Sequence, residues 1–224
     1  ALYAQIYRTL VARLEHEGRL ATFRRGEEIS ARIKARTGLN LGRVIFRELH
    51  ARLGGRIRFF GSGGAALPIE TFRRYSVLGI PLIQGWGLSE ASPLITGQRI
   101  SAAKFTFTRH FEDTAGTVGL AMPGVQLARI DIPEKGIFTQ LHGEGELVAR
   151  GPNIMLGYYK NEAATREIML EDWLRTGDIG RIDPAGHVYI TGRAKSVIVL
   201  ESGEKVYPDE LEERFQSGGV VGDV

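Results

Sequence analysis

The chain contains no cysteine and no hydrophobic run long enough to cross a membrane. The lack of cysteine excludes a disulfide-stabilised scaffold, a zinc site built on thiolates and a cysteine nucleophile. A membrane-spanning helix needs about 20 consecutive, mostly apolar residues, and the sequence nowhere provides them. No signal peptide is recognisable, and because Ala1 is not an initiator methionine we expect further chain before it.

Glycine, by contrast, is abundant, with 29 residues among 224. That is about 13% of the chain, against an average near 7% in soluble proteins. The glycines follow no fixed period, which excludes a collagen-like repeat, and they gather at the ends of predicted elements. They predict many tight turns and sites lined by backbone atoms.

Charge is spread unevenly along the chain. The net charge is +3, but residues 1–60 carry 13 Lys and Arg against 5 Asp and Glu. A basic segment of this kind favours contact with nucleic acid, an anionic membrane surface or an acidic ligand. The simpler interpretation is an arginine-rich helix surface that faces solvent.

Helical periodicity marks the beginning of the chain. Apolar residues spaced as on one face of a helix predict amphipathic helices over residues 2–14 and 41–53. Asn40 is the expected N-cap of the second helix, and the glycines at 54–55 end it. We expect the polar stretch 15–38 between the two helices to be only partly helical.

A βαβ unit follows the helices. Residues 56–60 predict a strand, residues 61–64 a glycine turn, and Pro68 the start of a helix that reaches Val77. A second apolar strand over 80–84 completes the unit. Its two strands are expected to be parallel, with sites at their carboxyl ends.

The rest of the chain is rich in predicted strands. The expected elements are strands 125–132, 145–150, 178–183 and 187–191, a helix 162–169, a hairpin of 196–200 with 205–207, and a final helix 209–215.

These elements predict an α/β fold in three parts. Residues 1–115 form an α/β subdomain with a basic helical front and a partial doubly wound parallel sheet. Residues 116–191 form a β-rich, barrel-like subdomain. Residues 192–224 form a third part, which begins with the predicted hairpin.

Three loops carry residues suited to chemistry, and the first is the glycine turn Gly-Ser-Gly-Gly-Ala-Ala at 61–66. It matches the G-x-G-x-x-A pattern of dinucleotide sites, where glycines let backbone N–H groups approach a phosphate or a flat ring. That pattern requires an acidic residue at the end of the next strand, and Gln84 stands there instead. A NAD site is therefore disfavoured, and a plain strand–helix turn remains the alternative.

The second loop presents Trp86 between Gly85 and Gly87 and continues to Ser89 and Glu90. The indole offers a face for a planar base, and the serine hydroxyl can donate to a phosphate oxygen. The glutamate is a hard oxygen ligand of the kind Mg²⁺ takes together with substrate phosphates. The alternative is a surface loop with a tryptophan in the core.

The same loop also resembles the nucleophile elbow of serine hydrolases. Residues 87–91 match G-x-S-x-G except for the last glycine, and Asp178 and His187 follow Ser89 in the order of a triad. An elbow requires a helix directly after the serine, which the Ser-Pro pair at 92–93 disfavours. A hydrolase is thus a weaker alternative.

The third loop pairs an acid with an arginine. Asp178 ends the run at 173–178, and Arg193 follows in the run at 192–195. A carboxylate can accept from both hydroxyls of a ribose, and an arginine can hold a phosphate or the ribose from the other side. Alone, however, Thr-Gly-Asp predicts only a turn.

In this order and at this spacing, the loops resemble the AMP-forming acyl-CoA synthetases of the adenylate-forming superfamily. The front segment RELHARLGGRIRF at 47–59 looks most like the long-chain fatty acid branch. The matching segments are SGGAALP (62–68), QGWGLSEASP (84–93), GTVGLAMPGV (116–125), GELVARGPNIMLGYYKNEAAT (145–165), WLRTGDIG (173–180) and GRAKSVIVLESGEKVYPDELE (192–212).

The resemblance implies how the adenosine is held. Gly63, Gly64 and Ala65 would lie along the adenine. Trp86 stands where the family usually has a tyrosine that stacks on the base, and lacks its hydroxyl. Asp178 would bind the ribose diol.

The resemblance also implies a phosphate and metal side of the site. Ser89 stands where the family usually has a threonine that touches the α-phosphate, and Glu90 would hold Mg²⁺. Arg193 would lie near the same ribose, and Ile190 would pack on the nucleoside.

Further positions are implied for the acyl and thiol substrates. Gln84 and Gly85 sit where the acyl pocket begins, and we count Gly87 with them among the binding residues. Lys195 takes the position of the hinge about which the family rotates its C-terminal domain, so the resemblance implies that residues 192–224 are this hinge and the truncated start of that domain. Gly203 lies in the loop that would admit the pantetheine arm.

The implied reaction has two steps. ATP and a carboxylate, here a long-chain fatty acid, give an acyl-adenylate and pyrophosphate, and coenzyme A then displaces AMP. No nucleic-acid partner is expected. We expect a cytoplasmic protein, with peripheral membrane contact through residues 1–60, and pairing into a homodimer along the exposed edge of an incomplete sheet.

Two features of the family have no counterpart in the sequence. These are the glycine-rich phosphate loop that ends in Lys-Gly and the catalytic lysine late in the C-terminal domain. We therefore expect the chain to be a fragment that does not catalyse adenylation by itself. A nucleotide-binding segment without catalysis, and a lipid-surface module built on residues 1–60, are the alternatives from other functional classes.

Overall fold

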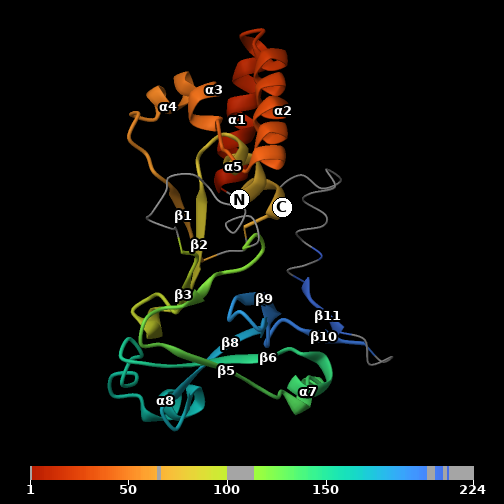
Figure 1. The fold of residues 1–224 in the computed structure, drawn as a ribbon. Coiled ribbons are helices and arrows are strands. Elements are labelled where there is room, and N and C mark those ends of the chain that lie inside the picture. The colour runs from red at the N-terminus through yellow and green to blue at the C-terminus, as the bar shows by residue number, and fades with distance from the viewer. Residues whose placement is uncertain (1, 65–66, 100–113, 201–204, 209–210, 212–224) are drawn as a thin grey trace. The chain divides into compact units, whose positions relative to one another are not determined.

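The chain folds into a series of helices followed by strands (Figure 1). The computed structural model describes residues 2–64, 67–99, 114–200, 205–208 and 211.

The chain divides into two compact units. The first comprises Ala1–Gln84 with Arg99–Gly116, and the second comprises Gly85–Gln98 with Thr117–Val224. The sequence-based division keeps 85–98 in the first subdomain, whereas the structure gathers this segment with the strand-rich part. The expected separate part at 192–224 stays a prediction.

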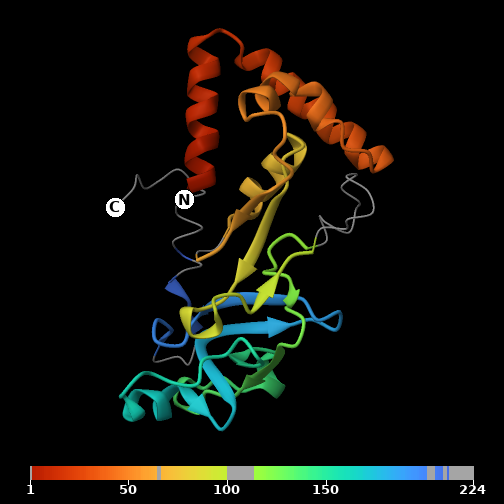
Figure 2. The ribbon, with the colours of Figure 1, turned by 90° about the vertical axis from the view of Figure 1, so that its left-hand side faces the viewer.

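The first unit begins with two helices, α1 (Leu2–His16) and α2 (Leu20–Thr37). Figure 2 shows them as two rods that meet at an angle. The prediction of a partly helical stretch over 15–38 was too cautious, because α2 is continuous over 18 residues. It ends at Gly38, whose φ of 74° places it in the left-handed region that favours glycine.

The predicted helix over 41–53 is instead two short helices, α3 (Gly42–Ile45) and α4 (Arg47–Arg52). They join at Phe46, whose buried ring lies 5.2 Å from the ring of Phe23. The expected cap residue before α3 does form a local bond, since the side chain of Asn40 accepts from the Gly42 N–H.

The βαβ unit is confirmed. Strand β1 (Phe60–Ser62) pairs in parallel with β2 (Leu82–Trp86), and α5 (Ile69–Val77) connects them. The first strand begins later than the predicted 56–60. One apolar core joins α1, α5, β2 and the junction between α3 and α4 at Phe46. Its buried members are Tyr7, Phe46, Leu67, Phe72, Tyr75, Leu78, Ile80 and Leu82.

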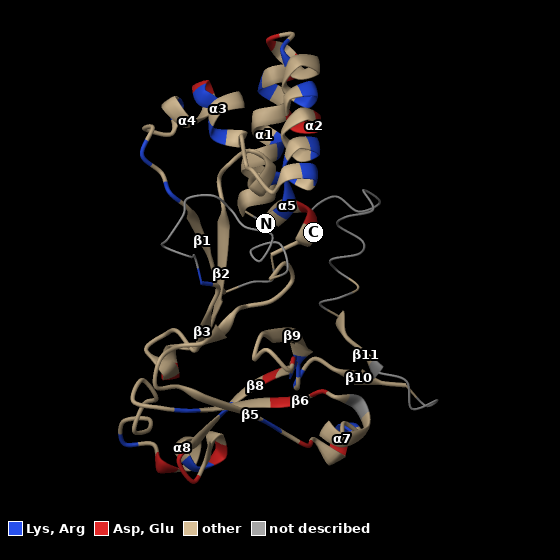
Figure 3. Ribbon diagram, in the orientation of Figure 1, with Lys and Arg blue, Asp and Glu red and all other residues tan. Residues whose placement is uncertain are grey.

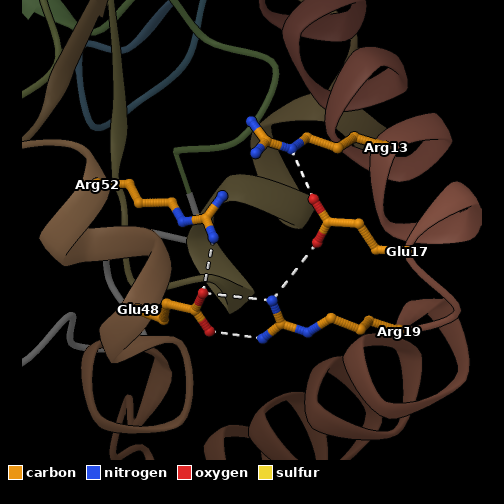
Figure 4. A network of polar contacts seen from close by, with 5 residues as sticks. All are labelled: Arg13, Glu17, Arg19, Glu48 and Arg52. Carbon is orange, nitrogen blue, oxygen red and sulfur yellow. Dashed lines mark hydrogen bonds and ion pairs between the residues drawn. The ribbon is translucent and has the colours of Figure 1, made fainter.

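A charged network ties the helices of this unit together (Figure 4). Arg19 contacts Glu17 at 3.5 Å and Glu48 at 2.5 Å, and so links the turn after α1 to α4. Arg13 and Arg52 complete it from α1 and α4. The network borders an apolar cavity of about 370 Å³ between the helices.

The second unit is built on an antiparallel sheet. Its strands are hydrogen-bonded in the order β5-β6-β8-β7, and β9 also pairs with β8. The bounds are β5 (Gln126–Ile130), β6 (Gly145–Arg150), β7 (Met169–Leu170), β8 (Trp173–Ile182) and β9 (Val188–Arg193).

Shorter elements complete the unit. They are η1 (Ser89–Ala91), β3 (Thr96–Gly97), β4 (Leu120–Ala121), η2 (Pro133–Lys135), α7 (Thr139–His142), α8 (Glu162–Ile168), β10 (Ile198–Val199) and β11 (Lys205–Val206).

The α/β class is confirmed, with two refinements. Strand β2 pairs in parallel with β1 but antiparallel with β3, so the first sheet is mixed. Over the described ranges, the β-rich part is an open sheet and does not close into a barrel. The predicted hairpin is present as β10 and β11, whereas the predicted helix 209–215 lies largely outside the described residues.

Lys and Arg gather on α1 and α2 (Figure 3), so the basic segment seen in the sequence is a helical surface. Among the described helices, none combines the length and the apolar character that crossing a bilayer requires.

Candidate functional site

The candidate site residues fall in both units, and the residues of each unit are described separately. Gly63 and Gly64 are exposed at the end of β1 in the first unit. Gly64 has a φ of +79°, which explains glycine at that position. Ala65 lies outside the described residues. The expected role of this turn at an adenine stays a prediction.

Strand β2 carries the chain from the glycine turn's unit to the second loop. Gln84 is buried in β2 opposite Ser62 and is the last residue assigned to the first unit. Gly85 and Trp86 then pair with β3 in the second unit. No acid stands at this strand end, which agrees with the sequence-based argument against a NAD site.

The turn after Trp86 depends on close backbone contact. A Cβ atom added to Gly87 would lie 1.9 Å from the carbonyl oxygen of Pro93, and one added to Gly85 would lie 2.9 Å from Leu94. The chain can therefore fold back to β3 in this way only because Gly87 lacks a side chain, whereas the contact at Gly85 is with the flexible end of a side chain. The return strand places Trp86 opposite Thr96.

The indole of Trp86 points into the second unit. Only 8% of the residue is exposed, and it belongs to the apolar core of this unit. Its Nε1–H donates to Oδ2 of Asp178 at 2.7 Å, in a buried hydrogen bond across 92 residues of sequence. The structure thus brings together Trp86 and Asp178, two of the residues that the family resemblance places around one nucleotide.

Asp178 lies on β8 directly opposite Arg193 on β9. Its residue exposure is 3%, and its Oδ1 lies 3.3 Å from Nε of Arg193. Ile190, also on β9, packs partly buried against the same core as Trp86. Both oxygens of the Asp178 carboxylate therefore face N–H donors.

A buried glutamate that the sequence reading missed supports this corner. Glu146 on β6 accepts from the Gly177 N–H and pairs with Arg175 at 2.6 Å. Its hydrogen bond raises the pKa of the Arg175 guanidinium, with burial opposing. Thr176 donates to the Leu147 carbonyl and accepts from the Asp178 N–H. The sequence offered one signal for Glu146, because an acid in the predicted strand 145–150 stands among apolar residues that face the core.

Ser89 and Glu90 begin the short helix η1, with Ser89 exposed and Glu90 half-buried. The hydroxyl of Tyr158 donates to Oε1 of Glu90 at 2.7 Å, and this bond raises the pKa of Tyr158. Asn153 donates to the Ala91 carbonyl at 2.9 Å and so fastens the same loop. Tyr158 and Asn153 were missed as residues, although both lie in the GELVARGPNIMLGYYKNEAAT segment.

The acids of the site suit one kind of metal binding. Within the described part of the chain, no group of three or more His, Asp or Glu residues could hold a metal ion. Glu90 is a single carboxylate at an accessible loop. That donor set fits Mg²⁺ bound mainly by the phosphates of a nucleotide, and does not fit a metal held by protein alone.

The remaining expected residues lie after β9. Lys195 is exposed in the turn that follows Arg193, and the Ala194 N–H donates to the Gly177 carbonyl. Gly203 lies outside the described residues. Their roles as a hinge and in a thiol channel stay predictions.

The triad expected for a serine hydrolase is not supported. Nδ1 of His187 lies 3.2 Å from Oδ2 of Asp183, so the ring faces a different acid from the one required. Asp178 instead faces Trp86 and Arg193.

The chain matches known proteins over most of its length. The family model described as AMP-binding enzyme matches residues 5–159. Peroxisomal long chain acyl-CoA synthetase 6 of Arabidopsis thaliana is 35% identical over 184 residues, which cover 80% of this chain and 25% of that protein. A chloroplastic long-chain-fatty-acid–[acyl-carrier-protein] ligase of the same plant is 32% identical over 191 residues, covering 80% and 24%.

A solved structure agrees with these relatives. The O-succinylbenzoate coenzyme A synthetase of Bacillus subtilis in complex with AMP has a TM-score of 0.62 and 25% sequence identity, covering 78% of this chain and 35% of that chain. The chain spans about a quarter of the length of the curated relatives it matches. With the family model matched over more than half of its residues, the chain belongs to the AMP-binding enzyme family.

Proposed function

We propose that this chain supplies the ribose- and metal-facing part of an AMP-forming acid–thiol ligase that acts on long-chain fatty acids. The observation that carries the proposal is the buried Asp178 carboxylate between Trp86 and Arg193. A carboxylate with ordered N–H partners is a rigid acceptor for the two hydroxyls of a ribose. The solved relative named above binds AMP.

The proposed reaction balances in two steps. A carboxylate oxygen of the fatty acid attacks the α-phosphorus of ATP, and pyrophosphate leaves with the electrons of the broken P–O bond. The sulfur of a thiol then attacks the carbonyl carbon of the acyl-adenylate, and AMP leaves. The first step gathers negative charge around the α-phosphate, where fixed donors and a cation lower the barrier.

Five candidate residues of the second unit have roles in this scheme. Asp178 accepts from the ribose hydroxyls, Arg193 lies beside the same ribose, and Ile190 packs against the nucleoside. Ser89 donates to the α-phosphate, and Glu90 contributes one carboxylate oxygen to Mg²⁺. When bound, Mg²⁺ supplies positive charge at the phosphates.

The residues of the glycine turn and the later loops extend the proposal. Gly63, Gly64 and Ala65 line the adenine. Gln84, Gly85 and Gly87 form the start of the acyl pocket and the turn beside it. Lys195 is proposed as the hinge residue, and Gly203 as a residue of the loop that admits the thiol.

The acyl acceptor is proposed to be coenzyme A. One relative is named as an acyl-CoA synthetase and the other as an acyl-carrier-protein ligase, so both thiols are tested. Assays with the longest expressed form of the protein that contains this chain would use ATP, palmitate and either acceptor. We expect palmitoyl-CoA and AMP. If only palmitoyl-carrier protein forms, the acceptor is the acyl-carrier protein and not coenzyme A. AMP binding without either product would favour a non-catalytic nucleotide-binding protein.

A further inference from the structure

Trp86 and Arg193 both contact the Asp178 carboxylate, and they differ in burial, distance and charge. Trp86 donates at 2.7 Å from a ring that is 8% exposed. Arg193 lies at 3.3 Å, and 63% of its side chain is exposed. Oδ2 of Asp178 therefore accepts from a buried indole N–H, whereas Oδ1 lies beside a guanidinium that is exposed to solvent.

The tryptophan cannot readily move. Its ring is part of the apolar core of the second unit, and the other buried members are Ala91, Ile95, Val118, Leu147, Ala149, Leu174 and Val188. Packed interiors resist displacement of a large ring, because every shift opens a void or forces a clash. The backbone of Trp86 is also held by its pairing with Thr96.

The arginine can exchange its partner more readily than the tryptophan can. Its guanidinium stays in contact with water, which competes for that group, although the carboxylate beside it is buried. A buried hydrogen bond to a charged group is stronger, and breaking it leaves the group without compensation. The carboxylate is therefore anchored at Oδ2 and open to exchange at Oδ1.

We propose that Trp86 is a positioning residue that holds the Asp178 carboxylate through its indole N–H, while Arg193 is the partner that gives way when ribose hydroxyls arrive. The inference rests on the proposed nucleotide-binding function. Each carboxylate oxygen has two lone-pair directions, so Asp178 keeps the indole bond while it accepts from a ribose. Little of the indole is exposed for a base to stack on, and the role assigned here is carried by its N–H.

The first test asks whether the indole bond exists and survives ligand binding. In ¹⁵N-labelled protein, the Trp86 indole N–H signal is identified by its absence in Trp86→Phe, with Trp173→Phe as the matched control. We expect this proton to exchange with solvent at least about tenfold more slowly than that of Trp173. Asp178→Asn should shift the Trp86 signal, and saturating AMP should leave it protected.

Two results would overturn the proposal at this stage. An unchanged Trp86 signal in Asp178→Asn would mean that no such bond forms. Loss of protection on adding AMP would mean that the indole, like the arginine, is displaced. Both readouts use proteins with Trp86 in place. They stand even if Trp86→Phe proves too unstable to study, because the chain has two tryptophans and the indole signal that remains in Trp173→Phe is that of Trp86.

The second test separates positioning from general damage to the fold. Trp86→Phe keeps an aromatic ring and removes the donor. We expect its dissociation constant for AMP to rise about tenfold, in line with loss of a charge-assisted bond. The constant for 2′,3′-dideoxy-AMP, which lacks both hydroxyls, should change less than about twofold. Equal weakening of both ligands would reduce Trp86 to a packing residue.

Failure of the proposed function looks different. If the unaltered protein binds AMP and the dideoxy analogue equally, or binds neither, Asp178 is not a ribose ligand. The exchange measurement still decides whether Trp86 holds the carboxylate.

Discussion

Single residues decide whether the proposed nucleotide site works, and Asp178 is the clearest case. It is buried, negatively charged and held by donors on two sides, an arrangement that is costly unless the charge keeps donors around it. The cross-strand pairing with Arg193 explains why an acid and an arginine fifteen residues apart meet. The same pairing could be expected from sequence once a hairpin was assumed.

Asp178→Ala should weaken AMP binding by roughly ten- to a hundredfold, since a hydrogen bond to a charged group contributes about 1.5–3 kcal/mol. In the enzyme assay, the KM for ATP should rise far more than the KM for the fatty acid. Asp172→Ala is the control, because Asp172 is an exposed acid paired with Arg150. Equal effects on both substrates would contradict a ribose-binding role.

Gly87→Ala tests the turn that delivers Trp86. The new methyl group would meet the Pro93 carbonyl at 1.9 Å, and forced overpacking typically costs about 1–3 kcal/mol. We expect a lower Tm by thermal unfolding. Gly97→Ala, on the neighbouring strand β3, meets its nearest side-chain atom at 3.7 Å and should change the Tm little. Similar losses in both variants would count against the specific clash.

At the scale of elements, the helices of the first unit are joined both by ion pairs and by apolar packing. The pKa of Glu48 is lowered to about 2 by its hydrogen bond and charge pairing with Arg19, with a smaller contribution from Arg52. Folding therefore favours the ionised form of this carboxylate. Because the network is exposed, water and salt limit what it contributes.

Glu48→Gln should lower the free energy of unfolding above pH 4.5, where the carboxylate is ionised in both folded and unfolded chains. The difference from the unaltered protein should shrink as the pH falls from 4.5 and vanish near pH 2. Urea unfolding at several pH values measures it. Glu70→Gln removes an acid paired at 3.3 Å within a single helix and serves as control. A difference that does not depend on pH would exclude the ionic explanation.

The basic surface of α2 is the second feature at this scale. Arg25, Arg32 and Arg36 are exposed on this helix, and Figure 3 shows the gathering of basic residues there. We expect the protein to sediment with vesicles that contain about a third anionic lipid, and to release in about 0.5 M salt, where the Debye length is only a few ångströms. Changing all three arginines to Gln should abolish sedimentation. Binding that resists both salt and the triple variant would point to apolar insertion.

At the scale of the whole molecule, the chain is about a quarter of the length of its curated relatives. The activity of the complete ligase is therefore a proposal. Experiments on this chain test only the site residues that it contains. The 224-residue chain should bind AMP measurably by calorimetry, and should show no fatty-acid-dependent exchange of pyrophosphate into ATP. Robust exchange by this chain alone would contradict its expected dependence on the missing phosphate loop and lysine.

The sequence by itself determined the family, the α/β class and the order of the longer elements, whereas β3, β4, β7 and α7 had no predicted counterpart. Short motifs fix these features because glycines, prolines and apolar periods act locally. Pro68 directly precedes α5, and the turn that follows the helix contains Gly79, whose φ is +77°. The motifs also predict Trp86, Glu90 and Asp178 as candidate site residues.

Only the tertiary structure decided what those residues touch. The tryptophan donates to the aspartate, Tyr158 donates to Glu90, and the buried Glu146 supports the turn, and none of these contacts is local. Packing likewise split the predicted helix at Phe46 and left the β-rich sheet open. Residue spacing sets local geometry, whereas the direction of a side chain in a core depends on every other chain segment packed against it.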